Sequence, residues 1–298
     1  KHSDLLSIEE ISRFVRIAAG EGISNIRITG GEPLVRKGVI DLVREINEID
    51  GIESLAMTTN GSLLAPMAQQ LKDAGLSRIN ISLDTLDPDQ FHMLTRRGSI
   101  EDAIEGIDAA LAVGFDPVKI NCVVIKSLDQ DFLGFAKLTL DKPLHVRFIE
   151  FMPVGYQAGI NDQGWTEADV IPSGELRQII SERTSKAGLG ELEAVGEDGK
   201  PAGNGPASYY KLPNSLGTIG FISSISNHFC KTCNRLRLTP DGYLRPCLFS
   251  DDEYDVKTAL RQGTDDDVRA VLENALLNKP DEHHHKVGTQ RNMSKIGG

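Results

Sequence analysis

Three of the four cysteines of the chain lie within one short segment and could bind a metal centre. Cys230, Cys233 and Cys247 have the spacing C-x2-C-x13-C. Two thiolates separated by two residues can bind one centre, and the intervening TPDGYLR stretch predicts a turn that brings Cys247 back alongside them. The set suits a structural zinc ion that takes a fourth protein ligand, or a [4Fe–4S] cluster with one iron open to a substrate.

The fourth ligand of a zinc site would be His228 or Cys122. Cys122 lies in the apolar stretch INCVVI, where a free cysteine is more often a packing residue of the core. We therefore expect Cys122 to be buried, while spacing alone leaves the zinc and iron–sulfur interpretations both open. Arg235, Arg237 and Arg245 lie in the same cysteine segment and predict a local site for a small phosphorylated ligand.

A second candidate site is the segment RITGGEPLVR, which follows a predicted strand. Its consecutive glycines, Gly30 and Gly31, allow backbone amides to approach a ligand closely. Glu32 precedes a rigid proline and places a carboxylate at the end of the strand, where an amino group is a suitable partner. In isolation, this pattern is more typical of an ordinary strand-to-helix turn.

The elements that must position these residues follow an alternating pattern. Short β-branched stretches alternate with amphipathic ones, which predicts parallel strands with right-handed helical connections. A capping box at Ser7 begins the first helix, which is expected to end at Gly20 or Gly22. The other expected elements are strands at 25–29, 54–59, 78–83, 118–124 and 145–151 and helices at 38–48, 63–74, 101–113 and 129–139.

Five strands are too few for a complete eight-stranded barrel, so the predicted fold is an open or partial α/β barrel with ligands at the carboxyl ends of its strands. The second half of the chain has a looser pattern. Residues 186–206 predict a mobile loop around a β-hairpin, and residues 256–278 predict a pair of helices. We expect two domains, a partial barrel at 1–155 and a C-terminal region with the cysteine site at 156–298.

Composition disfavours several classes of protein. The 298 residues carry a net charge of −11, whereas broad nucleic-acid interfaces depend on clustered Lys and Arg. No apolar run reaches the roughly 20 residues that cross a bilayer, and the first residues do not resemble a signal peptide. Few, clustered cysteines are typical of a reducing compartment. We therefore expect a soluble cytoplasmic protein that binds neither nucleic acid nor membrane.

The motifs TGGEP, ISLD, RFIEFMP and FC-x2-CNRLRL-x2-DG-x-LRPCLF resemble those of radical S-adenosylmethionine enzymes, and specifically of the GTP 3′,8-cyclase family of molybdenum-cofactor biosynthesis. The resemblance extends from residue 5 to residue 298, and the cysteine motif is more specific than TGGEP. It implies a lyase with a partial barrel of six βα units and a C-terminal extension. That extension would bind a [4Fe–4S] cluster through Cys230, Cys233 and Cys247.

The start of the sequence departs from the family pattern. Family members have an N-terminal C-x3-C-x2-C loop after their first strand, which holds the cluster that cleaves S-adenosylmethionine, but no cysteine precedes Cys122 here. Because LLSIEEI resembles the segment that follows this loop, we expect the first strand and the loop, with its second [4Fe–4S] cluster, to precede residue 1 in a longer chain. The alternative is a paralogue that has lost the loop and is inactive.

The resemblance also implies roles for individual residues. The positions that bind S-adenosylmethionine correspond to Gly31, Glu32, Ser82 and Met152. The positions that bind GTP correspond to Arg27, Thr58, Lys119, Arg235 and Arg237. The positions that act in catalysis correspond to Arg235, Arg237 and the terminal residues Gly297 and Gly298, since the final glycines of the family insert into the active site.

The implied reaction begins with a 5′-deoxyadenosyl radical that removes the 3′ hydrogen of GTP, and ends with 3′,8-cyclo-7,8-dihydro-GTP. The guanine would bind the open iron of the cluster. The expected partners are GTP, an external one-electron reductant, the next enzyme of the molybdenum-cofactor pathway and a second copy of the chain in a homodimer. Two other interpretations stay open: another radical S-adenosylmethionine enzyme with an auxiliary cluster, and a non-catalytic paralogue stabilised by zinc.

Overall fold

One sheet carries most of the candidate residues. The computed structural model describes residues 4–152, 164–203, 205–282 and 291. Within these ranges the sheet has eight strands in the order β1-β2-β3-β4-β5-β8-β7-β6, so β1 and β6 form its two ends. The strands are β1 Asn25–Ile28, β2 Ser54–Thr59, β3 Arg78–Ser82, β4 Val118–Val124, β5 Leu144–Glu150, β6 Glu193–Ala194, β7 Ser208–Lys211 and β8 Thr218–Ile222.

Strands β1 to β5 are parallel neighbours in chain order, and β8 pairs in parallel with β5. Their carboxyl ends therefore lie at one edge of the sheet. The predicted alternation is confirmed, and each of the five predicted strand boundaries differs from the observed one by at most one residue. Strands β6, β7 and β8 come from the C-terminal half of the chain and extend the same sheet beyond β5.

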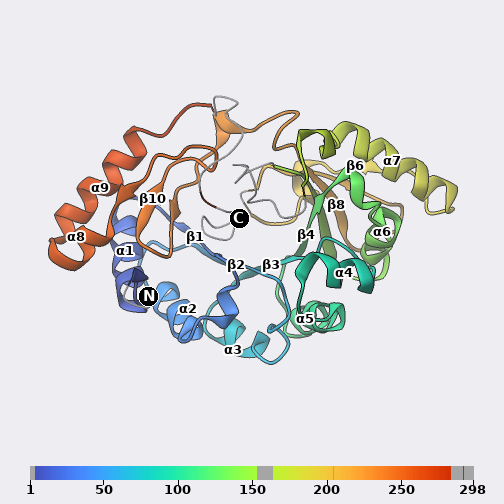
Figure 1. Ribbon diagram of the computed structural model, residues 1–298. Helices are drawn as coiled ribbons and strands as arrows, with labels where there is room; N and C mark the ends of the chain where they lie inside the picture. Colours follow the sequence, from blue (N-terminus) through green and yellow to red (C-terminus); the bar gives the residue numbers. More distant parts are fainter. Residues whose placement is uncertain (1–3, 153–163, 204, 283–290, 292–298) are drawn as a thin grey trace.

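Helices line the outer side of the curved sheet (Figure 1). Those of the first part are α1 Ile8–Gly20, α2 Val39–Asn47, α3 Ala68–Asp73, α4 Pro88–Thr95, α5 Ile100–Ala112, α6 Phe132–Asp141 and α7 Ser173–Lys186. The sequence pattern does not predict α4 or α7. Helix α4 buries none of its residues, and two of the four residues that α7 buries are Ser173 and Thr184, so neither helix shows a clear apolar stripe.

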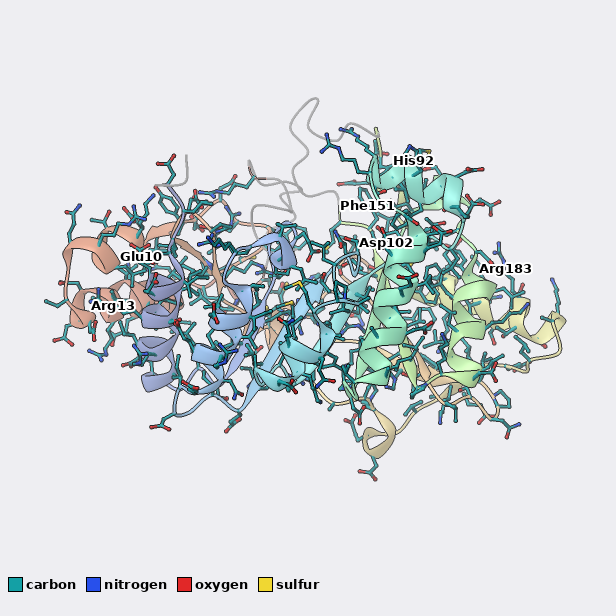
Figure 2. The ribbon with its side chains drawn as sticks, turned by 90° about the horizontal axis from the view of Figure 1, so that it is seen from below. Glu10, Arg13, His92, Asp102, Phe151 and Arg183 are labelled. Atoms are coloured by element: carbon teal, nitrogen blue, oxygen red, sulfur yellow. The ribbon has the colours of Figure 1, made fainter. Side chains whose placement is uncertain are left out.

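The predicted capping box begins α1. Glu10 N donates to Ser7 Oγ over 3.2 Å, and Ser7 N donates to Glu10 Oε2 over 2.7 Å. Helix α1 packs against α8, Lys257–Gln262, and α9, Asp265–Leu277, which confirms the predicted helix pair. Figure 2 labels Glu10 and Arg13 at this contact, where they form ion pairs with Arg261 and Asp265.

A continuous apolar core joins the sheet, its helices and the C-terminal helices. At its centre, the ring of Phe148 in β5 makes edge-on contacts with Phe132 and Phe135 of α6, with centroids 5.6 and 6.0 Å apart. Cys122 in β4 is fully buried, which confirms the core role predicted for it. In the described ranges, no helix has the length and apolarity of a membrane span.

A separate three-stranded antiparallel sheet carries the cysteine segment. Its strands are β9 Arg237–Leu238, β10 Tyr243–Arg245 and β11 Tyr254–Asp255, in the order β11-β10-β9. The turn between β9 and β10 contains Gly242, whose φ of +85° favours glycine. The predicted reversal of the chain at TPDGYLR is confirmed. The predicted hairpin around residues 186–206 is also confirmed, because β6 and β7 pair antiparallel on either side of the loop.

Candidate functional site

Four cations from neighbouring strands line one pocket in the sheet. They are Arg27 of β1, Arg78 of β3, Lys119 of β4 and Arg147 of β5, and the remaining lining residues are Ala56, Asn80, Gly203 and Gly205. The parallel register pairs Arg27 with Ala56 and Ala56 with Arg78, so these side chains lie in one row across three strands. The same register pairs Asn80 with Lys119 and Asn121 with Arg147.

The hydrogen-bond partners of these cations are neutral. Arg147 is 4% exposed, and its guanidinium donates to Asn80 Oδ1 over 2.7 Å and to Asn121 Oδ1 over 2.5 Å. Lys119 is 6% exposed, and its Nζ donates to the carbonyl oxygen of Ala202 over 2.6 Å. Throughout the described part of the chain, no carboxylate forms an ion pair with any of the four. Buried cations normally have a counter-ion, so the pocket suits an anionic ligand.

Three of these cations have lowered pKa values, as expected for positive charges that have no counter-ion among the residues that the structure describes. Burial lowers the pKa of Lys119 to about 7, with further lowering by Arg147, Arg78 and Arg27. Arg27 lies on the end strand, and its side chain keeps access to solvent. Desolvation by the surrounding protein nevertheless lowers its pKa to about 10, and the positive charges of Arg147 and Arg235 add to this lowering. Burial also lowers the pKa of Arg147. Binding of an anion would relieve this mutual repulsion.

A glycine-rich segment packs directly on the cations. Gly203 has a φ of +122°, and a Cβ atom there would lie 2.6 Å from Arg78 Nη1 and 3.3 Å from Lys119 Nζ. A Cβ atom at Gly205 would lie 3.7 Å from Arg147 Nη1. The segment belongs to the loop predicted at residues 186–206. The backbone conformation at Gly203 therefore favours glycine, and a side chain there would displace the Arg78 guanidinium.

The family resemblance indicated Arg27 and Lys119, but Arg78 and Arg147 were not predicted. The available signal was an arginine between buried apolar residues of a strand, as Arg147 is between Val146 and Phe148. Thr58, the other residue predicted in this region, lies beside the pocket, since Asn80 Nδ2 donates to Thr58 Oγ1 over 3.4 Å.

Two arginines of the cysteine segment act on the charges of the pocket. The positive charges of Arg235 and Arg237 both lower the pKa of Arg27. Burial lowers the pKa of Arg237 to about 10, with Arg235 adding to this and Cys233 and Cys247 acting in the opposite direction. The guanidinium of Arg235 lies 5.0 Å from the ring centroid of Phe229.

The hairpin folds the chain so that Cys247 returns toward Cys233. Cys230 begins a single 3-10 turn, Cys230–Thr232, and Cys233 N donates to Cys230 O over 3.0 Å. Strand pairing sets Arg237 opposite Arg245. Cys247, two residues after Arg245, therefore returns toward Arg235 and Cys233. All three thiols are free and half-buried.

A [4Fe–4S] cluster and a single metal ion require different arrangements of these thiols. Among the described side chains, no group of three His, Cys, Asp or Glu residues could hold one metal ion. In a [4Fe–4S] cluster each thiolate binds a different iron, so three half-buried cysteines on a turn and a hairpin fit that group. Cys122 is directed elsewhere, with its Sγ 3.6 Å from the carbonyl oxygen of Asp84. The zinc interpretation that uses Cys122 is therefore wrong.

Arg245 has a structural environment, and the prediction that it helps to hold a phosphorylated ligand is wrong. Its side chain is 1% exposed and forms an ion pair with Glu253, with Asp251 4.0 Å away. The guanidinium also donates to the carbonyl oxygen of Ser250. Its charge is already balanced inside the C-terminal sheet. Arg237 lies opposite Arg245 on the same face of this sheet, so the ion pair with Glu253, and not strand alternation, distinguishes Arg245.

The predicted contacts of S-adenosylmethionine lie after the parallel strands at their carboxyl edge. Gly31 follows β1, Ser82 ends β3 and Met152 follows β5. Glu32 joins two of the loops: its carboxylate accepts from Thr59 Oγ1 and Asn60 N, each over 2.7 Å, and from Leu34 N over 2.9 Å. Three of about four acceptor positions of this carboxylate are thus used.

Glu150 is a positioning residue that the sequence pattern does not reveal. This carboxylate ends β5 and is 1% exposed. It accepts from the backbone amides of Ser173, Ile225 and Ser226 over 2.7, 2.8 and 2.8 Å. Burial alone would raise its pKa, but the hydrogen bonds from the Ser226 hydroxyl and from these amides lower it. Glu150 therefore fixes the segment that leads from β8 into the cysteine turn.

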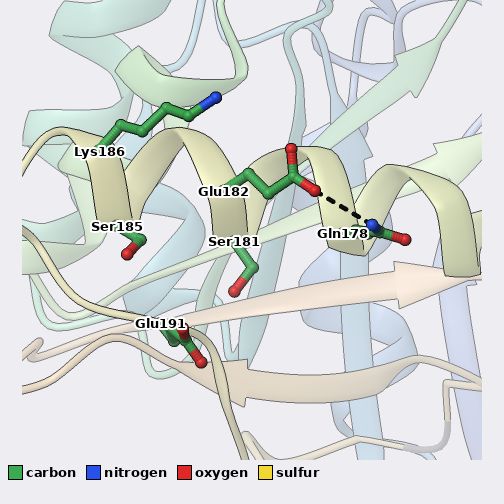
Figure 3. A pocket seen from close by; sticks show the side chains of 6 residues that line it. All are labelled: Gln178, Ser181, Glu182, Ser185, Lys186 and Glu191. Carbon is green, nitrogen blue, oxygen red and sulfur yellow. Dashed lines mark hydrogen bonds between the residues drawn. The ribbon is translucent and has the colours of Figure 1, made fainter.

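A larger pocket of about 500 Å³ lies beside α7 (Figure 3). Its lining residues are Gln178, Ser181, Glu182, Ser185, Lys186 and Glu191. In the close-up, Gln178 Nε2 donates a hydrogen bond to Glu182 Oε1 along the helix, over 3.0 Å. This pocket lacks the concentrated positive charge of the strand pocket. The predicted catalytic residues Gly297 and Gly298 lie outside the described residues.

Two family models match the chain in succession. One, described as the Radical SAM superfamily, matches residues 1–139, and the other, described as Molybdenum Cofactor Synthesis C, matches residues 144–285. The mixed α/β fold and these two matches define the class of protein, that of the radical S-adenosylmethionine enzymes.

Comparison with individual proteins narrows this class. A GTP 3′,8-cyclase of Pelotomaculum thermopropionicum is 46% identical over 100% of this chain and 89% of that protein. A GTP 3′,8-cyclase of Moorella thermoacetica is 46% identical over 100% of this chain and 88% of that protein. The solved structure of methylornithine synthase is 17% identical, with a TM-score of 0.47, over 59% of this chain and 52% of that one. On its similarity to the cyclases, the chain belongs to the GTP 3′,8-cyclase family.

Proposed function

We propose that the chain catalyses the radical S-adenosylmethionine-dependent cyclisation of GTP to 3′,8-cyclo-7,8-dihydro-GTP, the first step of molybdenum-cofactor biosynthesis. The observation that carries this proposal is the cluster of Arg27, Arg78, Lys119 and Arg147 without a carboxylate partner among the described residues. A triphosphate supplies the missing negative charge. The triphosphate lies away from the reacting carbon of the ribose, so its binding energy can be used to position that carbon.

The cations would hold the triphosphate in two ways. Arginine forks bind phosphate oxygens through two parallel hydrogen bonds, while Lys119 acts as a point charge. Arg235 and Arg237 of the cysteine segment both lower the pKa of Arg27 and would contact the same ligand. Thr58 offers a hydroxyl beside the pocket. Arg147, held by two asparagine side chains, would be oriented before the ligand arrives.

We assign Cys230, Cys233 and Cys247 as the ligands of a [4Fe–4S] cluster. Three thiolates leave one iron without a protein ligand, and that position suits the guanine base of GTP. The hairpin then orients the base, and the strand cations orient the phosphates. The ribose is held between these two contacts, so that only one of its carbons lies next to the source of the radical.

S-adenosylmethionine would bind at the carboxyl edge of the sheet, near Gly31, Glu32, Ser82 and Met152. The bound cofactors supply electron transfer and a carbon radical, whereas this chain's residues bind and orient. The remaining acceptor position of Glu32 suits the amino group of the ligand. Gly297 and Gly298 would enter the same cavity, and Arg235 and Arg237 would act on the substrate during turnover.

The wider assembly follows from the same proposal. The sheet would be a partial (βα)6 barrel completed by a first strand and a C-x3-C-x2-C loop with a second cluster, and 156–298 would form the C-terminal extension to the barrel at 1–155. An external one-electron reductant would supply electrons, and the next enzyme of the pathway would receive the product. A homodimer is the proposed assembly.

Nucleotide binding tests the pocket directly. We expect the reconstituted chain to bind GTP and to lose about 10- to 100-fold in affinity in Arg147→Met, because a hydrogen bond to a charged group contributes about 1.5–3 kcal/mol. Isothermal titration against GTP and guanosine measures this. Lys186→Met, in the pocket beside α7, is the matched control and should bind as wild type does. Equal affinities for GTP and guanosine would contradict the proposal.

The cluster assignment has its own test. Anaerobically reconstituted wild-type chain should contain about four irons per chain, and Cys247→Ala should lose most of them. Cys122→Ala should keep the iron, since Cys122 is a core residue. A full-length protein with the N-terminal loop should convert GTP to the cyclised product in the presence of S-adenosylmethionine and reductant, as followed by mass spectrometry. One zinc per chain and no iron would instead favour a zinc-stabilised paralogue.

A further inference from the structure

Lys279 lies against the cysteine hairpin, outside the residues assigned above. Helix α9 ends at Leu277, and Lys279 N donates to the carbonyl oxygen of Leu276 over 3.1 Å, so the chain turns there. Pro280 follows and favours an extended backbone at Lys279. Helix α9 packs against β10 (Figure 1), and the half-buried side chain of Lys279 is therefore directed at the hairpin.

The ammonium group of Lys279 makes three contacts there. Its Nζ donates to the carbonyl oxygen of Pro246 over 2.7 Å and to that of Arg235 over 2.9 Å, and it lies 3.8 Å from Cys233 Sγ. A lysine ammonium has three donors, and here all three are directed at the cysteine segment. The contacts join the residue before Cys247, a residue two positions after Cys233, and Cys233 itself.

We propose that Lys279 is a positioning residue for the [4Fe–4S] cluster: its ammonium fastens the two cysteine-bearing segments together and donates a charge-assisted hydrogen bond to the Cys233 sulfur. This inference rests on the proposed cluster at Cys230, Cys233 and Cys247. The chain before Cys247 and the chain after Cys233 are held at a fixed separation by one cation. The spacing of these two thiolates is thereby set before iron binds.

The same contact affects the electronic state of the cluster. Reduction adds one negative charge to a cluster held by thiolates, and a nearby cation or hydrogen bond to sulfur stabilises the reduced form. Lys279 therefore raises the reduction potential of the cluster. Lys231 lies within the cysteine turn as well, but its side chain is 83% exposed and its ion pair with Glu282 is 3.6 Å long. Solvent screens such a charge, and Lys231 should affect the potential little.

The experiment compares Lys279→Met, Lys279→Arg and Lys231→Met in the 298-residue chain, reconstituted anaerobically with iron and sulfide. Iron per chain is measured by a colorimetric assay, and the midpoint potential by a redox titration followed by electron paramagnetic resonance. We expect Lys279→Met to bind less iron, or to shift the reduction equilibrium of the bound cluster about tenfold toward the oxidised form, which is about 59 mV for one electron. Lys279→Arg keeps the charge and should stay near wild type, as should the matched control Lys231→Met.

The outcomes separate this inference from the proposal beneath it. If wild-type chain binds no cluster, the cysteine assignment fails. If wild type binds a cluster and Lys279→Met matches Lys231→Met in both iron content and potential, the role of Lys279 is wrong. Circular dichroism checks that each variant folds. Should Lys279→Met fail to fold, Lys279→Gln, which keeps a donor but no charge, takes its place, and an unchanged potential in that variant overturns the electronic role.

Discussion

Lys119 is the cation whose charge depends most on pH. Its pKa of about 7 in the free chain means that it is largely neutral above that pH. A bound triphosphate favours the charged form and raises the pKa. Between the free and bound pKa values, binding therefore takes up a proton, and the affinity falls as the pH rises.

We expect the GTP affinity of the wild-type chain to fall by up to about tenfold per pH unit above pH 7.5, where the triphosphate itself no longer titrates. Lys119→Met should bind GTP more weakly at pH 7 and show a flatter pH dependence. Isothermal titration in buffers of different ionisation enthalpy measures the proton uptake. Equal pH slopes in the two proteins would show that another group is responsible.

Part of this site is readable from residue types alone. Cysteine spacing predicts the C-terminal centre, and Cys122 is assigned to the core because an apolar strand surrounds it. The hydrogen-bond and ion-pair partners of each arginine could not be predicted, because they come from distant elements. Arg245 and Arg237 look alike in sequence, but of these two arginines only Arg245 forms an ion pair with Glu253 among the described contacts. Arg147 was not predicted because it lies between the buried apolar residues Val146 and Phe148, although it lines the pocket.

At the scale of elements, the β9–β10 hairpin determines where Cys247 lies relative to Cys233. Its turn depends on Gly242, where a Cβ atom would lie 2.5 Å from Lys257 Cβ and 3.1 Å from Leu6 Cδ2. The turn is thus both left-handed and tightly covered by α8 and the chain before α1. A side chain there must shift the hairpin or the elements that cover it.

We expect Gly242→Ala to destabilise the chain by more than about 1–2 kcal/mol, the cost of the left-handed conformation alone, and to bind less iron. The matched control is Gly188→Ala, which has a φ of +74° but no neighbour within 4 Å of its Cβ position. That variant should lose stability and keep its iron. Urea denaturation and iron content measure both effects. Full iron content in a folded Gly242→Ala would mean that the hairpin does not position Cys247.

The elements with regular apolar patterns were predictable, and those stabilised by other means were not. Strand β4 buries Val118, Ile120 and Val124, and α1 has a capping box and an apolar stripe. Helix α4 has no buried residue, although Asp87 Oδ1 caps it by accepting from Gln90 N over 2.7 Å. Strand β8 is buried throughout, but its pairing with β5 spans some 70 residues of chain that no local pattern encodes.

The whole molecule is acidic, yet it concentrates cations inside its sheet. Their repulsion opposes folding, and a polyanion that binds only the folded chain removes this cost. We expect GTP at 100 times its dissociation constant to stabilise the chain by about 2.7 kcal/mol. The Arg147→Met variant should gain less at the same GTP concentration. Thermal denaturation with and without GTP measures this, and an equal gain in both proteins would place the nucleotide elsewhere.

Strand β1 stands at the end of the sheet, and in the described part of the chain no strand lies along its outer side. Its amides and carbonyls on that side form a template on which another strand can be laid. The first strand proposed to precede residue 1 would pair along this border, and a chain without that strand would instead offer the border to a second copy. A short complementary peptide laid along the same border would protect it and compete with such pairing.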